Sequence, residues 1–180
     1  MSPRQFVLFD FDGVIADTFG TSFAYVRRFN PWLTTSQYRA LFEGNINETG
    51  KRLRWGTLRE WHRLYARALL GDDPIPGIQD AVRALSERYG LAVISSSFSA
   101  PMREYLDRHD LTRCFLEIMG TDTHPSKHEK IKMVFDRYDA EPEDCVFVTD
   151  TLGDMREASL VGVAAIAVTW GFHPPETLLP

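Results

Sequence analysis

The chain has 180 residues, of which 44% are hydrophobic, so it can bury one full core and a small accessory domain but not two large domains. A formal net charge of −5 argues against binding of nucleic acid or acidic membranes through bulk charge. We expect a soluble protein without a membrane partner, because no stretch approaches the roughly 18 apolar residues that span a bilayer and no signal peptide is recognisable. The only two cysteines, Cys114 and Cys145, lie far apart without the spacing of a zinc site, which favours a reduced, cytoplasmic setting.

Four short apolar runs predict the strands of a sheet. They are Phe6–Phe9, Leu91–Ile94, Val146–Val148 and Ala164–Val168, and each stops abruptly at small or polar residues. The runs are continuous rather than alternating, which is typical of strands that helices cover on both faces.

Helical patterns separate these runs from residue 74 onward. Apolar stripes at helical spacing run from Ile78 to Tyr89, where Gly90 stops the first, and from Ile131 to Tyr138. The alternation of strands and helices predicts an α/β fold, a doubly wound parallel sheet with right-handed crossovers.

Residues 15–73 interrupt this alternation, because they hold helical patterns but no convincing strand. One helix is expected from Phe19 to Phe29 and another from Leu58 to Leu69, before a linker dense in turn-forming residues. We therefore expect a small helical cap over residues 15–73, inserted into a core made of residues 1–14 and 74–180.

Polar residues with chemical potential gather at the predicted strand ends, where an open α/β sheet forms its ligand crevice. Three or four carboxylates at one place can bind a hard cation such as Mg²⁺, which neutralises phosphoryl oxygens near an anionic nucleophile. The combination predicts phosphoryl transfer with Mg²⁺ as the cofactor. In chain order the residues are Asp10, Asp12, Ser95, Ser96, Lys127, Asp150 and Asp154.

Each candidate catalytic residue answers one need of that reaction. Asp10 needs no deprotonation near neutral pH, so it can attack phosphorus and form an aspartyl phosphate. Asp12 can donate a proton to the leaving group and then activate water. Ser95, with Ser96 beside it, and the charge of Lys127 can bind and stabilise the phosphoryl oxygens.

Two assignments stay open at this point. Lys130 competes with Lys127 for the active-site position, because both lie in the same lysine-rich segment. Asp154 can support the metal or can cap the helix that follows it.

The ordered combination resembles the four motifs of the haloacid dehalogenase-like superfamily. Phe9–Val14 is similar to the first motif in its phosphatase form, and Val93–Ser96 is similar to the second. Lys127 occupies the approximate place of the third motif, and Val146–Asp154 resembles the fourth. The second motif departs from the frequent pattern in reading Ser-Ser.

This resemblance implies a Rossmann-like fold and Mg²⁺ bound by Asp10, the main-chain carbonyl of Asp12 and Asp150, with support from Asp154. The cap resembles that of phosphoglycolate phosphatase-like and β-phosphoglucomutase-like enzymes. True dehalogenases of the superfamily lack the second aspartate of the first motif, so Asp12 favours phosphoryl transfer.

Basic residues of the cap are candidates for contact with a substrate. The arginines spaced by four residues from Arg59 to Arg67 share the face opposite an apolar stripe, so they are expected in solvent. Arg52 and Arg54, with Lys51, escape this argument and are predicted to bind the substrate. The cap tryptophans can line a pocket or form the core of the cap. They are Trp32, Trp55 and Trp61.

We therefore expect Mg²⁺-dependent hydrolysis of a small phosphorylated metabolite through phospho-Asp10. A phosphomutase would use the same intermediate, and product analysis for an isomerised sugar phosphate separates the two. A non-catalytic, partner-binding protein on the same fold is the rival from another class, but it has no physical need for Asp10, Asp12, Lys127 and Asp150 together.

Overall fold

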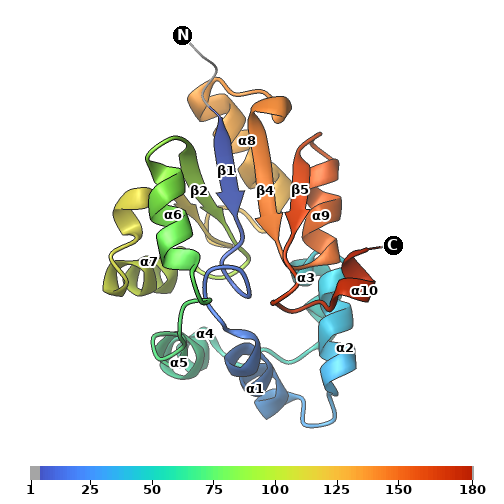
Figure 1. The fold of residues 1–180 in the computed structure, drawn as a ribbon. Coiled ribbons are helices and arrows are strands. Elements are labelled where there is room, and N and C mark those ends of the chain that lie inside the picture. The colour runs from blue at the N-terminus through green and yellow to red at the C-terminus, as the bar shows by residue number, and fades with distance from the viewer. Residues whose placement is uncertain (1–4, 180) are drawn as a thin grey trace.

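The computed structural model describes residues 5–179 and shows one parallel sheet with helices on both faces (Figure 1). The strand order β3-β2-β1-β4-β5 places β1 at the centre. The strands are β1 (Phe6–Phe9), β2 (Gly90–Ile94), β3 (Glu117–Met119), β4 (Cys145–Thr149) and β5 (Ala164–Ala167).

The two edge strands differ from the expectation. β3 was not predicted, because it has three residues, one of them charged, and its place depends on pairing with β2. β5 was predicted as covered on both faces, but Ile166 on it is 53% exposed, as an edge position allows.

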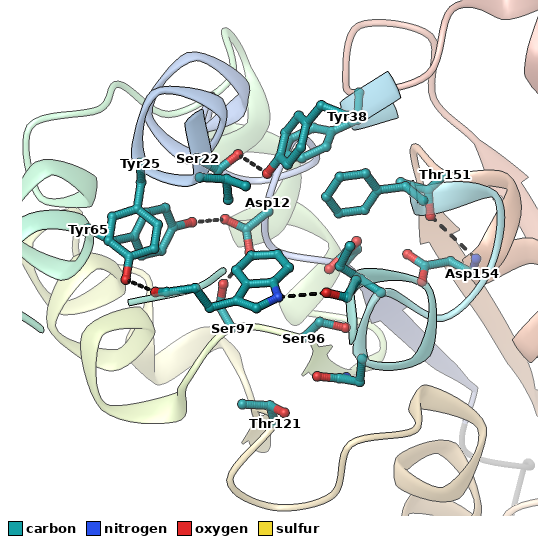
Figure 2. Close-up of a pocket in the computed structure, with 18 of the residues that line it drawn as sticks. Asp12, Ser22, Tyr25, Tyr38, Tyr65, Ser96, Ser97, Thr121, Thr151 and Asp154 are labelled. Atoms are coloured by element: carbon teal, nitrogen blue, oxygen red, sulfur yellow. Dashed lines mark hydrogen bonds between the residues drawn. The ribbon is translucent and has the colours of Figure 1, made fainter. Parts of the chain in front are cut away.

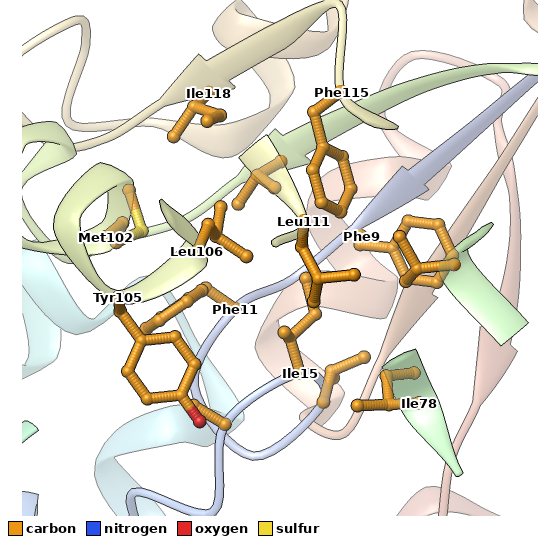
Figure 3. Packing of buried hydrophobic residues seen from close by; sticks show 14 of the residues in the cluster. Phe9, Phe11, Ile15, Ile78, Met102, Tyr105, Leu106, Leu111, Phe115 and Ile118 are labelled. Atoms are coloured by element: carbon orange, nitrogen blue, oxygen red, sulfur yellow. The ribbon is translucent and has the colours of Figure 1, made fainter. Parts of the chain in front are cut away.

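Two helices cover each face of the sheet, which confirms the doubly wound arrangement. On one face, Val82 and Leu106 pack with Val93 of β2, and Figure 3 shows part of this cluster. On the other face, Ile131 packs with Phe147 of β4. The first pair is α6 (Ile78–Ser86) and α7 (Ser99–Arg108), the second is α8 (Lys127–Tyr138) and α9 (Leu152–Ser159), and α10 (Pro175–Leu178) follows β5.

The cap segments form a separate layer at the carboxyl ends of the strands (Figure 1). Tyr25, Tyr38 and Tyr65 contribute to a cluster of their own, which Phe172 of the core chain joins. The cap helices are α1 (Phe19–Phe29), α2 (Thr35–Ala40), α3 (Ile46–Thr49), α4 (Leu58–Trp61) and α5 (Arg67–Leu69), with a π-helical turn at His62–Ala66. Single 3₁₀ turns lie at Leu41–Glu43, Gly50–Arg52, Thr112–Cys114 and Pro142–Asp144.

The chain enters and leaves the cap along two adjacent segments. The Ile75 amide donates to the Ile15 carbonyl at 2.9 Å, and the Asp17 amide donates to the Asp73 carbonyl at 3.0 Å. Ile15 is buried with the residues of the sheet, so the first turn after residue 14 still packs on the core.

Two helices differ from what the sequence pattern predicts. α6 stops at Ser86, and Gly90 begins β2 rather than only terminating the helix. The helix expected from Leu58 to Leu69 is interrupted by its π-helical turn. Within residues 5–179, no helix combines the length and apolarity needed to cross a bilayer.

Candidate active site

The register of the sheet brings three strand ends to one place. Phe9 lies opposite Val93 on β2 and Val148 on β4. The Asp10 amide continues the ladder by donating to the Val148 carbonyl at 2.9 Å. The side chains that follow β1, β2 and β4 therefore meet at the carboxyl edge of the sheet, as the sequence predicted.

Asp10 is buried beneath the cap and faces a lysine. Its Oδ1 accepts a hydrogen bond from the Phe11 amide at 2.7 Å, and its Oδ2 lies 2.7 Å from Lys127 Nζ. Burial raises the pKa of Asp10 well above its usual value, although Lys127 opposes this shift. Its carboxylate therefore depends on nearby positive charge.

Lys127 is the lysine of the site. It is the first residue of α8, is 3% exposed, and places Nζ 2.6 Å from Asp154 Oδ2 as well as beside Asp10. Burial favours the neutral amine, but the two carboxylates raise the pKa of Lys127 overall. The ammonium is therefore held as a fixed positive charge.

Lys130, the other candidate for the active-site lysine, contacts main-chain carbonyls instead. Its Nζ donates to the Ser95 carbonyl and, at 3.4 Å, to the Gly120 carbonyl. Burial, with Lys127 nearby, lowers the pKa of Lys130 to about 8. Lys130 therefore supports the loop after β2 and does not touch Asp10.

Both carboxylate oxygens of Asp12 accept hydrogen bonds from side-chain hydroxyl groups (Figure 2). Thr18 and Tyr65 each donate to Oδ1 at 2.8 Å. Ser97 donates to Oδ2 at 2.7 Å, whereas Ser95 lies further away at 3.4 Å. These contacts fix Asp12 next to Asp10 with its oxygens directed at the space beneath the cap.

The Asp150 carboxylate packs closely against two glycines, Gly13 and Gly171. A Cβ built on Gly13 would lie 2.1 Å from Asp150 Oδ2, and one on Gly171 would lie 2.2 Å from it. The Phe172 amide donates to Oδ2 at 2.6 Å. Among the residues that the structure describes, nothing hydrogen-bonds to Asp150 Oδ1, although that atom is buried.

Asp154 does not cap the helix α9. Thr151 is the N-cap residue and accepts a hydrogen bond from the Asp154 amide at 3.3 Å. Asp154 Oδ2 instead accepts hydrogen bonds from Lys127 and from Thr149 Oγ1, at 2.6 and 2.7 Å. Despite burial, the positive charge of Lys127 lowers the pKa of Asp154. The structure therefore contradicts the capping alternative, and support of the metal by Asp154 stays a prediction.

The oxygen atoms at this edge suit a hard cation. Within residues 5–179, no three His, Cys, Asp or Glu side chains form a metal-binding group by themselves. Two carboxylates, Asp10 and Asp150, lie at this edge with the main chain of Asp12, and the buried Asp150 Oδ1 has no hydrogen-bond donor in the part of the chain that the structure describes. Burial raises the pKa of Asp150 to about 7, which a neighbouring cation would oppose. The donor set fits Mg²⁺, whose ligands are oxygens and commonly include water.

A cavity of about 440 Å³ lies between the cap and the strand ends. Ser96 lines it, whereas Ser95 lies behind it and accepts a hydrogen bond from the Ser97 amide at 2.9 Å. Arg52 and Arg54, which were expected to bind the substrate, are exposed and do not line it. Among the predicted site residues, those that line it are Asp10, Asp12, Lys51, Ser96, Lys127 and Asp154.

Sequence reasoning missed residues that complete the site. Ser97 belongs to the serine run after β2, so its position already offered a signal. Thr18 and Tyr65 gave none, because their contacts with Asp12 depend on how the cap folds over the core. Trp55 and Trp61 line the cavity, whereas Trp32 is 62% exposed.

The fold and this site define an enzyme of a known family. The sequence model of the haloacid dehalogenase-like hydrolase family matches residues 7–168, so the chain belongs to that family. Phosphoglycolate phosphatase from Synechococcus elongatus is 27% identical over 187 residues, which cover 97% of this chain and 88% of that protein. Phosphoglycolate phosphatase 1 from Pseudomonas aeruginosa is 28% identical, with 95% and 71% covered. The predicted class, a phosphoric monoester hydrolase, is confirmed.

Solved structures show the same fold. A haloacid dehalogenase-like family protein from Streptococcus pneumoniae superposes with a TM-score of 0.76 at 22% identity, covering 99% of this chain and 91% of that one. CbbY from Rhodobacter sphaeroides, solved with xylulose-(1,5)bisphosphate, gives 0.74 at 21% identity, with 98% and 91% covered. The Rossmann-like fold predicted from the sequence is confirmed.

Proposed function

We propose that the chain hydrolyses a small organic phosphate monoester with Mg²⁺ through a phosphoryl group carried on Asp10. The observation that carries this proposal is the arrangement at the end of β1. Asp10 and Asp12 both line the cavity, and Lys127 Nζ lies 2.7 Å from Asp10 Oδ2. A nucleophile, a proton carrier and a fixed positive charge therefore share one cavity.

Two steps account for the atoms and protons. In the first, an oxygen of Asp10 bonds to phosphorus while the bond from phosphorus to the alcohol oxygen breaks, and protonated Asp12 gives its proton to that oxygen. In the second, Asp12 takes a proton from water as the water oxygen bonds to phosphorus and the bond between phosphorus and the Asp10 oxygen breaks, which releases inorganic phosphate and restores the Asp10 carboxylate.

The metal would be held by Asp10, the main-chain carbonyl of Asp12 and Asp150. When bound there, Mg²⁺ neutralises phosphoryl oxygens that would otherwise repel the Asp10 carboxylate. Asp154 contributes indirectly, because it binds Lys127 and so keeps the ammonium beside Asp10.

The cap would exclude water from the reaction and select the substrate. Phosphoglycolate enters as one candidate through the names of the two phosphatase relatives. A small phosphorylated metabolite is the expected partner, because the cap lies over the strand ends where the cavity is found.

The test is release of inorganic phosphate from a panel of small phosphate monoesters, with Mg²⁺ or with excess chelator. We expect release with Mg²⁺ and its loss with chelator, restored when Mg²⁺ is added back. Release that continues unchanged in chelator would contradict the metal requirement, and no release from any ester would contradict the proposed function.

A further inference from the structure

Aromatic side chains dominate the cavity above Asp10 and Asp12. Its volume of about 440 Å³ lies within the range of about 300–1,000 Å³ that is typical of sites for drug-sized ligands, and exceeds what a two-carbon acid needs. The aromatic residues that line it are Tyr25, Tyr38, Phe42, Trp55, Trp61, Tyr65, Phe98 and Phe172.

The three tyrosine hydroxyls and the Trp55 indole N–H are already engaged by the protein. Tyr25 donates to the Trp55 carbonyl at 2.5 Å, and Trp55 Nε1 donates to the Gly50 carbonyl at 2.8 Å. Tyr38 donates to Ser22 Oγ at 3.0 Å, and Tyr65 donates to Asp12 (Figure 2). The rings therefore offer a ligand mainly carbon surface and π faces.

Ring-to-ring contacts join the lining residues into two groups, and Tyr65 of the first group donates to Asp12 (Figure 2). In the first group, Trp61 lies 4.7 Å from Phe98 and 5.3 Å from Tyr65, measured between ring centroids. In the second, Phe42 lies 5.2 Å from Tyr38 and 4.9 Å from Phe172. A flat group entering between them would meet rings supported by other rings.

Positive charge for a second anionic group is scarce. Within residues 5–179, the basic side chains that line the cavity are Lys51 and Lys127. Lys127 is committed to Asp10 and Asp154 at the phosphoryl end. Lys51 pairs with Glu48, and both side chains are about two-thirds exposed, at 65% and 68%. A substrate carboxylate among the rings would lose hydration without a buried cation to replace it.

We propose that the preferred substrate is a phosphate monoester whose alcohol part carries an aromatic ring, bound between the two groups of rings. This inference rests on the proposed function and narrows it. The small anionic body of 2-phosphoglycolate, which the names of the relatives suggest, would fit this cavity poorly.

The first experiment compares kcat/KM for benzyl phosphate, methyl phosphate and 2-phosphoglycolate with Mg²⁺ present. Benzyl phosphate is the ester of an alkyl alcohol, so it lacks the good leaving group that makes phenyl phosphate reactive. We expect kcat/KM for benzyl phosphate to exceed both others by at least about tenfold, because buried apolar contacts of this size discriminate at that level. A preference for 2-phosphoglycolate would overturn the inference and leave the phosphatase function intact.

A variant locates the effect in the ring cavity. Trp61→Ala should lower kcat/KM for benzyl phosphate by at least about tenfold more than it lowers kcat/KM for methyl phosphate. Trp32→Ala is the matched control, because Trp32 also belongs to the cap but is 62% exposed and does not line the cavity. Equal losses for both esters in Trp61→Ala, or an equal loss in the control, would contradict ring recognition.

Binding separates failure of this inference from failure of the proposed function. Titration calorimetry with benzylphosphonate and methylphosphonate, which cannot be hydrolysed, measures binding in the cavity without turnover. Tighter binding of benzylphosphonate with no phosphate release from any ester would leave the ring site standing and reject the phosphatase mechanism. Equal binding of the two phosphonates would reject the ring site.

Discussion

Asp12 is held by hydroxyl groups from both parts of the molecule. Ser95 and Ser97 follow β2 of the core, whereas Thr18 directly precedes the cap helix α1 and Tyr65 comes from the π-helical turn of the cap. A π turn displaces side chains from the positions they would have in an α-helix. The turn therefore helps to determine where the Tyr65 hydroxyl lies. Tyr65 is thus a positioning residue for the proposed acid/base group.

Tyr65→Phe tests that role. We expect kcat to fall by about tenfold with little change in KM, because a hydrogen bond to a carboxylate contributes about 1.5–3 kcal/mol. Steady-state kinetics measure the split between kcat and KM. Tyr105→Phe is the matched control, because the buried Tyr105 hydroxyl has no hydrogen-bond partner among residues 5–179. A rise in KM at unchanged kcat would show that Tyr65 only binds the substrate.

At the scale of single residues, sequence motifs located the strand-end chemistry because each motif is local. Asp10, Asp12 and Asp150 follow apolar runs directly, so their shared edge could be inferred from a parallel sheet alone. Arg52 and Arg54 were misplaced, because the fold of the cap and not their sequence neighbourhood decides which side chains face the cavity.

The helix α8 carries two lysines one turn apart with different tasks. Lys127 faces Asp10, whereas Lys130 donates to the carbonyls that follow β2 and β3. The sequence pattern predicted this helix but could not rank the two lysines, since the choice depends on the position of the undetected β3. Strands β1, β2 and β4 were found because their apolar runs are self-evident in the sequence.

Lys130 should make stability depend on pH. Its pKa is about 8 in the folded chain against an ordinary value of 10.5, so the unfolded chain binds more protons between these values. Lys130 therefore increases the free energy of unfolding by about 2 kcal/mol as the pH rises from about 8 to about 10. Urea unfolding of the native chain and Lys130→Met across this range measures the difference. If the difference in unfolding free energy between the native chain and Lys130→Met stays constant or changes in the opposite direction with pH, the burial of a neutralised amine is contradicted.

At the scale of the whole molecule, the cap is docked on the core at several separate points. Asn47 Nδ2 donates to the Pro125 carbonyl at 2.7 Å, and His173 Nε2 lies 2.9 Å from the Arg39 carbonyl. Gly153 of α9 lies against Gly44, so close that a Cβ there would lie 2.5 Å from the Gly44 carbonyl oxygen. These contacts, which no local sequence pattern encodes, enclose the active site.

Gly153→Ala should disturb this docking. The added methyl group meets backbone atoms that cannot move independently, so we expect a loss of about 1–3 kcal/mol in the free energy of unfolding and a lower kcat/KM. Gly20→Ala is the control, because nothing lies within 4 Å of a Cβ at that cap position and alanine favours helix. Denaturant titration and kinetics read both effects, and equal behaviour of the two variants would contradict the proposed contact.

The most direct test of the central claim is to detect a phosphoryl group on Asp10. Asp12→Asn is incubated with Mg²⁺ and p-nitrophenyl phosphate, whose leaving group needs no proton, and the chain is quenched in acid and its mass measured. We predict one added phosphoryl group on the peptide that contains Asp10, and none in Asp10→Asn. A native chain that turns over while the adduct is absent from Asp12→Asn, or maps to another residue, would contradict Asp10 as the nucleophile.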